Sequence, residues 1–451
     1  MSSGLGNPLG EWRSRMTFVL SLACATVGMG SVWRFSYLSG EYGGGPFVVA
    51  YVVFLLLLGV PLLIAELVLG RQGMGSVVES INRVVERSRL RPVWRVLPWF
   101  ICATGVLLLA LYVVVAGWAL VYAAAMYAGS FNAASMFNAG QYFQALVEDG
   151  DRMLLGQTLF LAGAVAVVGA GVRRGIGFIA WLLVPTLLAG LVLLVQYSLA
   201  NGNASAAGKF LFSVQWLDFN SEALLMALGQ AFFTLGVGVG TGISYGSYAP
   251  VRAPIGRSVL AVALFDTLVA IAMGLAIFPL VFASHLVPSM GPGLMFISLP
   301  YAFGNMLNGE VFGALFFALV VLVALGSAIA ILEPVTGAIK QRFGLRRVTS
   351  AVIVGAVVWL LAYAAAATLA PSSRGTAPDL FRHMDQLAGG VLLPLAALGT
   401  ALLVGWRLGR PLLRAQLYRE SPQFFSLWYF LLRYIAPLGI LLVMATALLT
   451  E

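Results

Sequence analysis

Long apolar runs recur along the whole 451-residue chain. Many approach the ~20 residues that a helix needs to cross about 30 Å of hydrocarbon. A soluble protein of this length could not bury all of its apolar surface if 61% of its residues were hydrophobic and only 10% were charged, as they are here. We therefore predict an all-α polytopic membrane protein with eleven transmembrane helices. Their expected ranges are 12–37, 46–70, 94–128, 154–172, 176–200, 221–249, 257–285, 310–341, 348–370, 380–408 and 424–449.

The positions of the basic residues predict the orientation. The formal net charge of +9 could suggest a nucleic-acid partner, but most of the 26 Lys and Arg residues lie in short loops between apolar runs. If the N-terminus is cytoplasmic, the external loops hold only Arg152, Lys209, Arg374 and Arg382. Cytoplasmic loops are enriched in Lys and Arg. We expect a multi-pass protein with a cytoplasmic N-terminus, an external C-terminus and no nucleic-acid partner.

Two of the predicted spans contain stretches that should not be helical. They are residues 26–31 in the first span and residues 236–242 in the sixth, where glycines alternate with other residues. Glycine weakens a helix by roughly 1 kcal/mol relative to alanine, and backbone opened at membrane depth must bond an ion, a ligand or a buried side chain. Interrupted helices at corresponding positions of two halves are typical of inverted-repeat transporters. The glycines alone would equally fit close packing between helices.

These patterns predict one transmembrane domain over residues 1–451. The first inverted repeat would span 12–200 and contain helices 1–5. The second would span 221–408 and contain helices 6–10, and 424–449 would be an additional helix 11. Helices 1 and 6 would be the broken ones, with the binding site at the membrane midplane.

Several motifs, in order and over nearly the whole chain, resemble the neurotransmitter:sodium symporter family. They are Trp12-Arg13-Ser14-Arg15, Val27 through Phe35, Gly43-Gly44-Gly45-Pro46-Phe47, Gly59-Val60-Pro61 through Glu66 to Gly70-Arg71, Gln230 through Leu235, and Ser244-Tyr245 to Ser247-Tyr248. The resemblance implies a five-plus-five inverted-repeat fold that works by alternating access. Eleven spans are similar to many bacterial members, so we expect a bacterial inner membrane location and sodium-coupled symport of amino acids.

The resemblance also implies a substrate site. The tyrosine matching Tyr112 hydrogen-bonds the substrate carboxylate in the family, and the amides of Met29 and Gly30, at a helix N-terminus, suit the same group. Gly28 stands where monoamine carriers have an aspartate, which favours a substrate that brings its own carboxylate. The carbonyls of Thr26, Phe233 and Thr234 would face the substrate ammonium. The side-chain pocket would be lined by Thr26, Met29, Leu108, Tyr112, Phe233, Gly236, Val239, Ser327 and Ile331.

This pocket contains no charged residue, and Gly236 and Val239 are smaller than the residues often found at those positions in the family. Leu108 and Met29 are bulky and offset part of the gained space. The expected substrate is a large hydrophobic or aromatic amino acid.

The two sodium sites depart from the family pattern. The first would use the Thr26 carbonyl, Ser31, Thr234 and Asp266, where the family usually has asparagine at positions 31 and 266. The second would use the carbonyls of Cys24, Val27 and Val323 together with the Ser327 hydroxyl, and Gly326 replaces a further hydroxyl residue. We expect sodium coupling, with a second site that is weaker or completed by water.

Asp266 also predicts transport without chloride. By resemblance, the family's chloride site involves residues matching Tyr51 and Gln230 and a serine that falls here at Ala270, which offers no donor. Asp266 lies four residues before Ala270, one helical turn along the same face. A sodium ion in contact would keep this carboxylate ionised, so one residue could be both sodium ligand and fixed counter-charge.

Four residues are predicted gates. The resemblance implies an extracellular gate formed by an ion pair between Arg34 and Asp385. It also implies that Phe233 lies over the substrate. On the inside, Trp12 and Tyr248 remain. The usual arginine–aspartate pair is absent there, because Leu9 and Gln341 occupy the two positions.

In span 5, Gly175 and Pro185 match a Gly-x9-Pro motif whose unwinding opens a water path in the family. An ordinary helix-start glycine and a kinking proline would give the same pattern.

Three possibilities remain open from the sequence, and the symporter is the first of them. A sodium-independent or proton-coupled amino-acid exchanger of the same fold would explain the incomplete second sodium site. A membrane substrate sensor or channel is a third possibility, although no signalling domain is appended. We do not expect an enzyme, because no nucleophile–base or metal constellation is present. The sequence does not give the oligomeric state.

Overall fold

The computed structural model describes residues 9–213, 219–288, 293–369 and 379–449, and within them the chain is helical without strands. The first half contains α1 (Arg15–Thr26), α2 (Phe35–Glu41), α3 (Gly45–Phe54), α4 (Val60–Gly73), α5 (Val77–Arg87), α6 (Leu97–Tyr127), α7 (Met136–Glu148), α8 (Gly150–Ala170), α9 (Phe178–Asn201) and α10 (Ala204–Phe212). The second half contains α11 (Ser221–Thr234), α12 (Thr241–Tyr248), α13 (Ile255–Ala283), α14 (Leu299–Gly304), α15 (Gly309–Phe343), α16 (Arg347–Ala367), α17 (Leu380–Asp385), α18 (Leu393–Leu402), α19 (Arg410–Gln416), α20 (Pro422–Phe430) and α21 (Ala436–Leu449). Arg374, expected in an external loop, lies outside the described residues.

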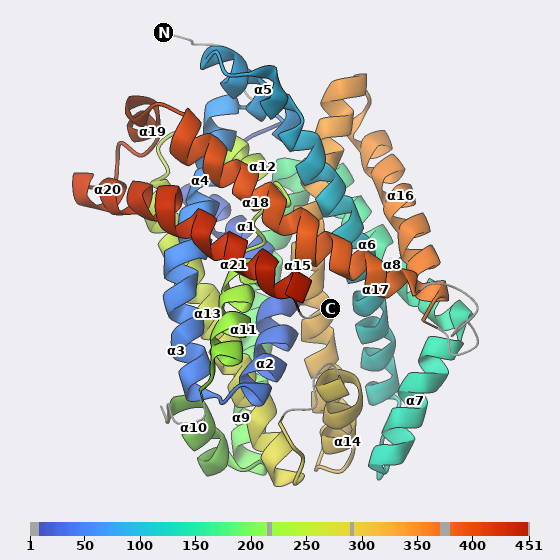
Figure 1. Cartoon of the computed structure of the whole chain (residues 1–451). Coiled ribbons are helices and arrows are strands. Elements are labelled where there is room, and N and C mark those ends of the chain that lie inside the picture. Colours follow the sequence, from blue (N-terminus) through green and yellow to red (C-terminus); the bar gives the residue numbers. More distant parts are fainter. Residues whose placement is uncertain (1–8, 214–218, 289–292, 370–378, 450–451) are drawn as a thin grey trace.

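Short 3₁₀- or π-helical segments join several of these α-helices end to end. They are η1 (Gly30–Arg34), η2 (Leu55–Gly59), η3 (Pro92–Arg95), η4 (Val172–Gly177), η6 (Leu294–Ser298), η8 (Gln386–Leu392), η9 (Leu403–Arg407) and η10 (Leu431–Ile435). Figure 1 shows the long helices running side by side, with α5 and α19 toward one end of the molecule and α7, α10 and α14 toward the other.

Nine helices in the described part are long and apolar enough to cross a membrane, and a tenth span results if the bent pair Arg15–Thr26 and Gly30–Glu41 counts as one. The predicted sixth span consists of two short helices, α11 and α12. The all-helical multi-span architecture is as predicted, while the count of eleven spans stays a prediction.

The first predicted interruption, residues 26–31, is present but shorter, because Thr26 still belongs to α1 and η1 begins at Gly30. Helix α1 ends at Thr26, Val27 is extended with φ −68° and ψ 104°, and helix resumes after a bend of 56°. The second interruption covers residues 235–240 rather than 236–242, because α12 already begins at Thr241. Gly236, Gly238 and Gly240 have φ of +60°, +94° and +79°. Only glycine adopts this region readily, which explains the alternating glycines.

Glu66 of α4 stabilises the second break by accepting hydrogen bonds from its backbone. Its carboxylate is fully buried and accepts hydrogen bonds from the backbone N–H groups of Gly238 at 2.7 Å and Gly242 at 3.1 Å. Gly242 itself lies inside α12, where a Cβ would come within 2.6 Å of Glu66. A buried backbone N–H without an acceptor is costly, so this carboxylate replaces the helical carbonyls that the break removes.

Glycines outside the two breaks do serve close packing. A Cβ on Gly70 of α4 would lie 1.8 Å from the carbonyl oxygen of Ile243 in α12, and one on Gly246 would lie 2.2 Å from that of Leu67. Small residues let membrane helices approach closely. These contacts bring α12 directly against α4, and thus position the second break next to Glu66.

Candidate functional site

Asp266 of α13 is the centre of a buried cluster of oxygen atoms. Its Oδ1 accepts a hydrogen bond from Ser31 Oγ at 2.6 Å. Its Oδ2 accepts from Thr234 Oγ1 at 3.2 Å and Tyr51 Oη at 3.1 Å. Ser31 Oγ and Thr234 Oγ1 are 3.2 Å apart, and all four side chains are nearly or fully inaccessible to solvent. Ser31 lies after the first break and Thr234 just before the second, so the cluster joins both interrupted helices to α13.

Three of the four residues predicted for the first sodium site therefore meet. The fourth, Thr26, is buried at the end of α1, and its hydroxyl donates to the Ala23 carbonyl at 3.3 Å. Tyr51 of α3 completes the cluster. The sequence points to Tyr51 only as part of the family's chloride site.

Tyr112 and Ser327 both lie against the first break, close to Gly28. The backbone N–H of Met29 donates to Tyr112 Oη at 3.2 Å. Ser327 Oγ donates to the carbonyls of Ala25 and Val27 at 3.2 and 3.3 Å. A Cβ on Gly28 would lie 2.6 Å from Ser327 Oγ and 3.4 Å from Tyr112 Oη. Gly28 is thus required by packing as well as being suited to a carboxylate-bearing substrate.

Open space remains beside both breaks. A Cβ on Gly30 or Gly236 would meet nothing within 4 Å. The other nine residues predicted for the substrate site are buried or half-buried. The buried ones are Thr26, Met29, Thr234, Val239 and Ser327, and the half-buried ones are Leu108, Tyr112, Phe233 and Ile331. The structure adds Gly105 of α6, whose Cβ would lie 3.6 Å from Ile331 Cγ2 and from the Val239 carbonyl. As an isolated glycine in an apolar helix, it carries no signal that sequence reasoning could use.

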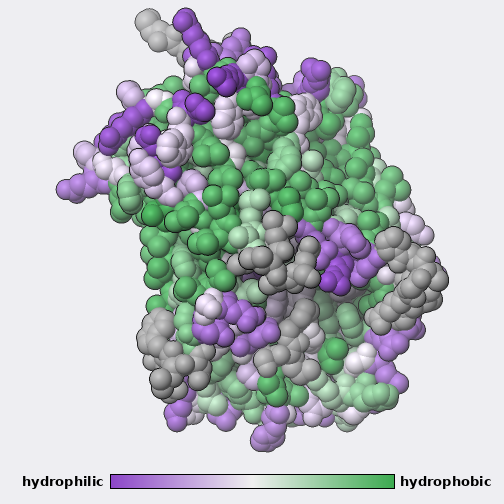
Figure 2. All heavy atoms as spheres, in the orientation of Figure 1, coloured by the Kyte–Doolittle hydropathy of each residue, from purple (hydrophilic) through white to green (hydrophobic). Residues whose placement is uncertain are grey.

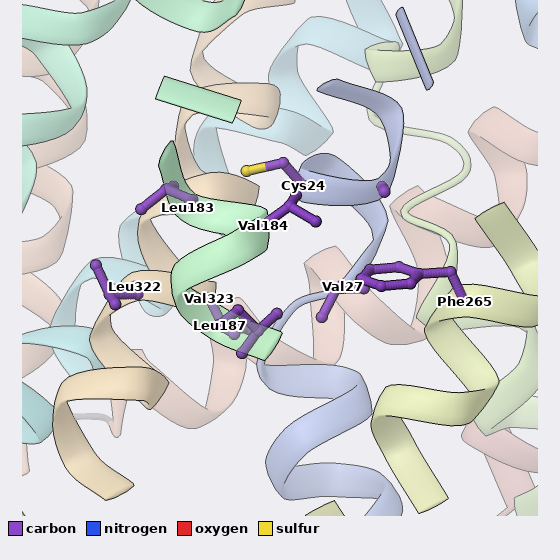
Figure 3. Close-up of a pocket in the computed structure, with 9 residues that line it drawn as sticks. Cys24, Val27, Leu183, Val184, Leu187, Phe265, Leu322 and Val323 are labelled. Atoms are coloured by element: carbon purple, nitrogen blue, oxygen red, sulfur yellow. The ribbon is translucent and has the colours of Figure 1, made fainter. Parts of the chain in front are cut away.

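Three of the four residues predicted for the second sodium site, Cys24, Val27 and Val323, border a narrow pocket, and Ser327 is not part of its lining. Figure 3 shows Cys24 and Val27 facing side chains from α9, α13 and α15 across it. The lining consists of Ala23, Cys24, Val27, Leu183, Val184, Leu187, Phe265, Leu322 and Val323. A Cβ on Gly326 would lie 2.5 Å from the Cys24 carbonyl oxygen and 2.6 Å from Cys24 Sγ. Cys24 therefore occupies the space that the Cβ of a larger residue at position 326 would need.

The outer gate differs from the predicted ion pair. Arg34 and Asp385, both described, form no salt bridge with each other. The Arg34 guanidinium instead lies over the Phe233 ring, 4.5 Å from its centroid. A cation over an aromatic face is stabilised by the ring quadrupole. Gly389 of η8 lies close to Phe233. A Cβ added to it would be 3.7 Å from Phe233 Cζ and 4.0 Å from Asp385 Oδ1.

The residues predicted for the inner gate pack around Trp12. Its indole N–H donates to the Val172 carbonyl at 3.1 Å, and its ring meets Tyr245 and Tyr248 edge-on with centroids 5.0 and 5.7 Å away. Leu9 packs toward Gly337, and Gln341 accepts from the backbone N–H of Ser76 at 2.7 Å. An apolar contact and a neutral hydrogen bond thus occupy the positions of the missing charge pair.

A buried ion pair that sequence reasoning missed lies at the same end. Tyr248 Oη donates to Glu333 Oε1 at 2.6 Å, Arg347 Nη2 bonds Glu333 Oε2, and Arg347 Nε donates to the Val168 carbonyl at 2.8 Å. Glu333 is fully buried. An ionisable residue within a membrane span is a functional candidate by default, and Glu333, inside an otherwise apolar helix, carries that signal.

The Gly-x9-Pro segment is helical in this structure. Gly175 lies in η4 and Pro185 inside α9. A Cβ on Gly175 would come within 1.9 Å of the Val167 carbonyl oxygen. Glycine is therefore explained here by a close backbone approach, and the unwinding stays a prediction.

These features match known proteins. A model of the sodium:neurotransmitter symporter family matches residues 9–139 and 141–450. The chain belongs to this family. A relative from Bacillus subtilis, the uncharacterized sodium-dependent transporter YhdH, is 32% identical over 443 residues and 96% of each chain. An uncharacterized sodium-dependent transporter of Haemophilus influenzae is 26% identical over 441 residues, again 96% of each chain.

The crystal structure of MhsT in complex with L-phenylalanine superposes with a TM-score of 0.87 and 34% identity, covering 97% of this chain and 99% of that one. This agreement confirms the predicted family and the all-helical transporter fold. The protein is therefore a multi-pass membrane transporter of the sodium:neurotransmitter symporter family.

Gly28→Ala should weaken substrate binding by this symporter about tenfold or more. The new methyl group would overlap Ser327 Oγ, and overpacking typically costs about 1–3 kcal/mol. Ser327→Ala removes the overlapping atom, so the double variant should bind better than Gly28→Ala alone. Binding of radiolabelled amino acids to the purified protein measures this. A Gly28→Ala variant with unchanged affinity would contradict the contact as described.

Proposed function

We propose that this protein carries a large hydrophobic or aromatic amino acid together with sodium by alternating access, without chloride. The observation that carries the proposal is the buried cluster in which Asp266 is bonded by Ser31, Thr234 and Tyr51 between the two broken helices. The sodium-dependent relatives and the phenylalanine-bound neighbour support the same conclusion.

The cluster suits a sodium ion. An aspartate at this depth without a cation costs about 2.5–3.5 kcal/mol on insertion scales. Hard cations prefer oxygen ligands, and Ser31, Thr234, Asp266 and the nearby Thr26 supply them. The carboxylate contributes one fixed negative charge beside the ion. Ala270, one turn along α13 and fully buried, offers no donor to an anion. These features favour sodium binding that needs no chloride.

The substrate site suits an amino acid. Tyr112 Oη and the Met29 amide already face each other at the first break, where a carboxylate would find both donors. The surrounding half-buried side chains of Leu108, Phe233 and Ile331 are apolar. Open space at Gly30 and Gly236 gives room for a large side chain.

The second sodium site is the least complete part of the proposal. Gly326 supplies no hydroxyl, and Cys24 packs against it. The apolar pocket beside Cys24, Val27 and Val323 offers few hard oxygens. This observation favours weak binding of a second sodium, and it is also what favours the alternative, a proton-coupled or sodium-independent exchanger of the same fold.

Uptake into proteoliposomes tests the proposal. An inward sodium gradient should drive accumulation of labelled phenylalanine above the level reached with potassium or a proton gradient. Replacing chloride by gluconate should leave the rate unchanged. A competition panel should favour large hydrophobic and aromatic amino acids over glutamate and lysine. Equal uptake in sodium and potassium would support the exchanger, and uptake that collapses in gluconate would refute chloride independence.

A further inference from the structure

The C-terminal part of the chain carries arginines without matching acids. Residues 397–449 contain five arginines, at 407, 410, 414, 419 and 433, and one acidic residue, Glu420. Glu420 is nearly buried and is paired with Arg257 of α13, Nε to Oε2 3.4 Å. Within the described ranges, none of the five arginines forms a salt bridge. Their charge is therefore not balanced by the protein's own carboxylates at this place.

Three of these arginines lie against aromatic rings from η9 and α20. The Arg410 guanidinium carbon is 5.5 Å from the Tyr429 centroid, and that of Arg433 is 5.8 Å from the same centroid. Arg433 also lies 4.5 Å from the Trp406 ring, and Arg414 lies 5.4 Å from Phe425. We call this set the arginine–aromatic cluster; its members are Trp406, Arg410, Arg414, Phe425, Tyr429 and Arg433.

The cluster lies at the rim of the molecule where polar and apolar surfaces meet. In Figure 1, α19 and α20 project at one edge near the end marked by α5. Figure 2 shows hydrophilic side chains gathered over that corner, with hydrophobic surface continuing below them. Trp406 is 50% exposed, and tryptophan and tyrosine are enriched at membrane–water interfaces. The rim therefore lies where phospholipid headgroups would be.

The arrangement leaves the positive charge uncompensated, since the hydrogen-bond partners of these arginines within the described ranges, such as Ser426 Oγ for Arg410 Nη2 at 3.2 Å, are neutral. Two like charges share the Tyr429 ring, and a ring quadrupole attracts cations without neutralising them. Arg433 lies within the span Pro422–Ala445 and uses Nη1 to donate to Tyr429 Oη at 3.1 Å, while its Nε is buried with no hydrogen-bond partner. Guanidinium groups match the oxygens of a phosphate in a two-bond geometry. A phosphate that reaches both guanidinium groups would offset their charge.

We propose that the arginine–aromatic cluster binds the headgroup phosphate of an anionic phospholipid. Basic pockets between membrane helices are suited to such headgroups. An apolar row continues from the cluster along α20 and α21, with Leu427 59%, Phe430 51% and Leu438 59% exposed. That row offers a surface for acyl chains, which a free phosphate would not use. The site lies outside the residues proposed for transport, so the two proposals can fail independently.

Native mass spectrometry of the purified full chain with added phosphatidylglycerol and phosphatidylcholine tests the proposal. The wild-type protein should retain phosphatidylglycerol in preference to phosphatidylcholine. Arg410→Gln and Arg433→Gln should each lower that affinity about fivefold, the effect expected for one basic residue near an anionic membrane surface. Arg91→Gln is the matched control, because it removes the same charge from an exposed arginine outside the cluster.

Thermal unfolding supplies a second measurement that does not depend on lipid retention in the gas phase. Phosphatidylglycerol should raise the melting temperature of the wild-type and Arg91→Gln proteins more than that of Arg410→Gln. Arg410→Lys, which keeps the charge, should fall between wild type and Arg410→Gln. Equal retention of the two lipids by the wild type, or an equal loss in Arg91→Gln, would overturn the proposal. Stabilisation by inorganic phosphate as strong as that by the lipid would assign the site to free phosphate instead.

Discussion

Asp266→Asn should weaken the apparent sodium affinity of substrate binding by roughly ten- to a hundredfold. The substitution keeps the shape of the side chain but removes the charge at the centre of the Ser31–Thr234–Tyr51 cluster. Hydrogen bonds to a charged group are worth about 1.5–3 kcal/mol, and direct attraction to a bound cation is lost as well. Binding of labelled phenylalanine across a series of sodium concentrations measures the shift.

A stability measurement separates this effect from misfolding. Without sodium, the buried carboxylate is a desolvated charge, and replacing such a group by a neutral one is often neutral or stabilising. The Asp266→Asn protein should therefore melt no lower than wild type in potassium, but should lose the rise in melting temperature that sodium produces. Asp151→Asn, the same change at an exposed position in the first turn of α8, is the control. Unchanged sodium affinity in Asp266→Asn would contradict the assignment.

The same residue predicts a chloride response. If Asp266 supplies the fixed negative charge, its neutral variant lacks a counter-charge beside the ion. Adding Ala270→Ser restores a hydroxyl donor one turn away, so the double variant should recover part of its sodium-dependent binding in chloride and not in gluconate. Recovery that is equal in both anions would show that the charge is supplied elsewhere.

Arg347→Ala should open or destabilise the end of the molecule at which α12, α15 and α16 meet. Glu333 is fully buried and would keep only its bond from Tyr248. Breaking a buried pair by removing one partner costs about 3–5 kcal/mol. The bond from Arg347 to the Val168 carbonyl at the end of α8 would be lost too. We expect a lower melting temperature and, in a Cys102→Ala background, faster alkylation of Cys24.

Two further variants decide whether the buried charge is the cause. Glu333→Gln combined with Arg347→Ala leaves no unpaired charge and keeps an acceptor for Tyr248, so it should regain much of the lost stability. Arg346→Ala removes an exposed arginine one residue earlier and should behave as wild type. A double variant no more stable than Arg347→Ala would mean that the ion pair is not what stabilises this end.

Much of the fold follows from local sequence. Runs of apolar residues near the length of a bilayer require helices, because an unpaired backbone cannot be satisfied in hydrocarbon. The expected ranges 94–128 and 310–341 therefore correspond closely to Pro92–Tyr127 and Gly309–Phe343. The breaks are visible in the sequence for a similar reason. The alternating glycines at 236, 238 and 240 are needed for positive φ, a property of single residues that needs no knowledge of neighbours.

Part of the site is also accessible from the sequence, because a charged residue inside an apolar helix must have a partner. The family resemblance points to Asp266 together with Ser31 and Thr234, and the rule adds that the Asp266 charge must be compensated. For Arg34 the rule requires only that the charge is compensated, and it is the resemblance that selects Asp385, whereas in this structure the guanidinium lies over Phe233. The sequence shows that a charge needs compensation, but the aromatic face of Phe233 is as available to a guanidinium as a carboxylate is.

The sequence by itself determined the helices, their two interruptions and the chemical types gathered near them. Only the tertiary structure decided which groups meet, because pairings such as Glu66 with Gly238, Arg347 with Glu333, or Tyr51 with Asp266 join different elements. Those pairings depend on how closely α12 approaches α4 and on which faces of α13 and α15 turn inward. The glycines at 70 and 246 allow the close approach of α12 to α4. No local pattern within one helix specifies its distance to another helix.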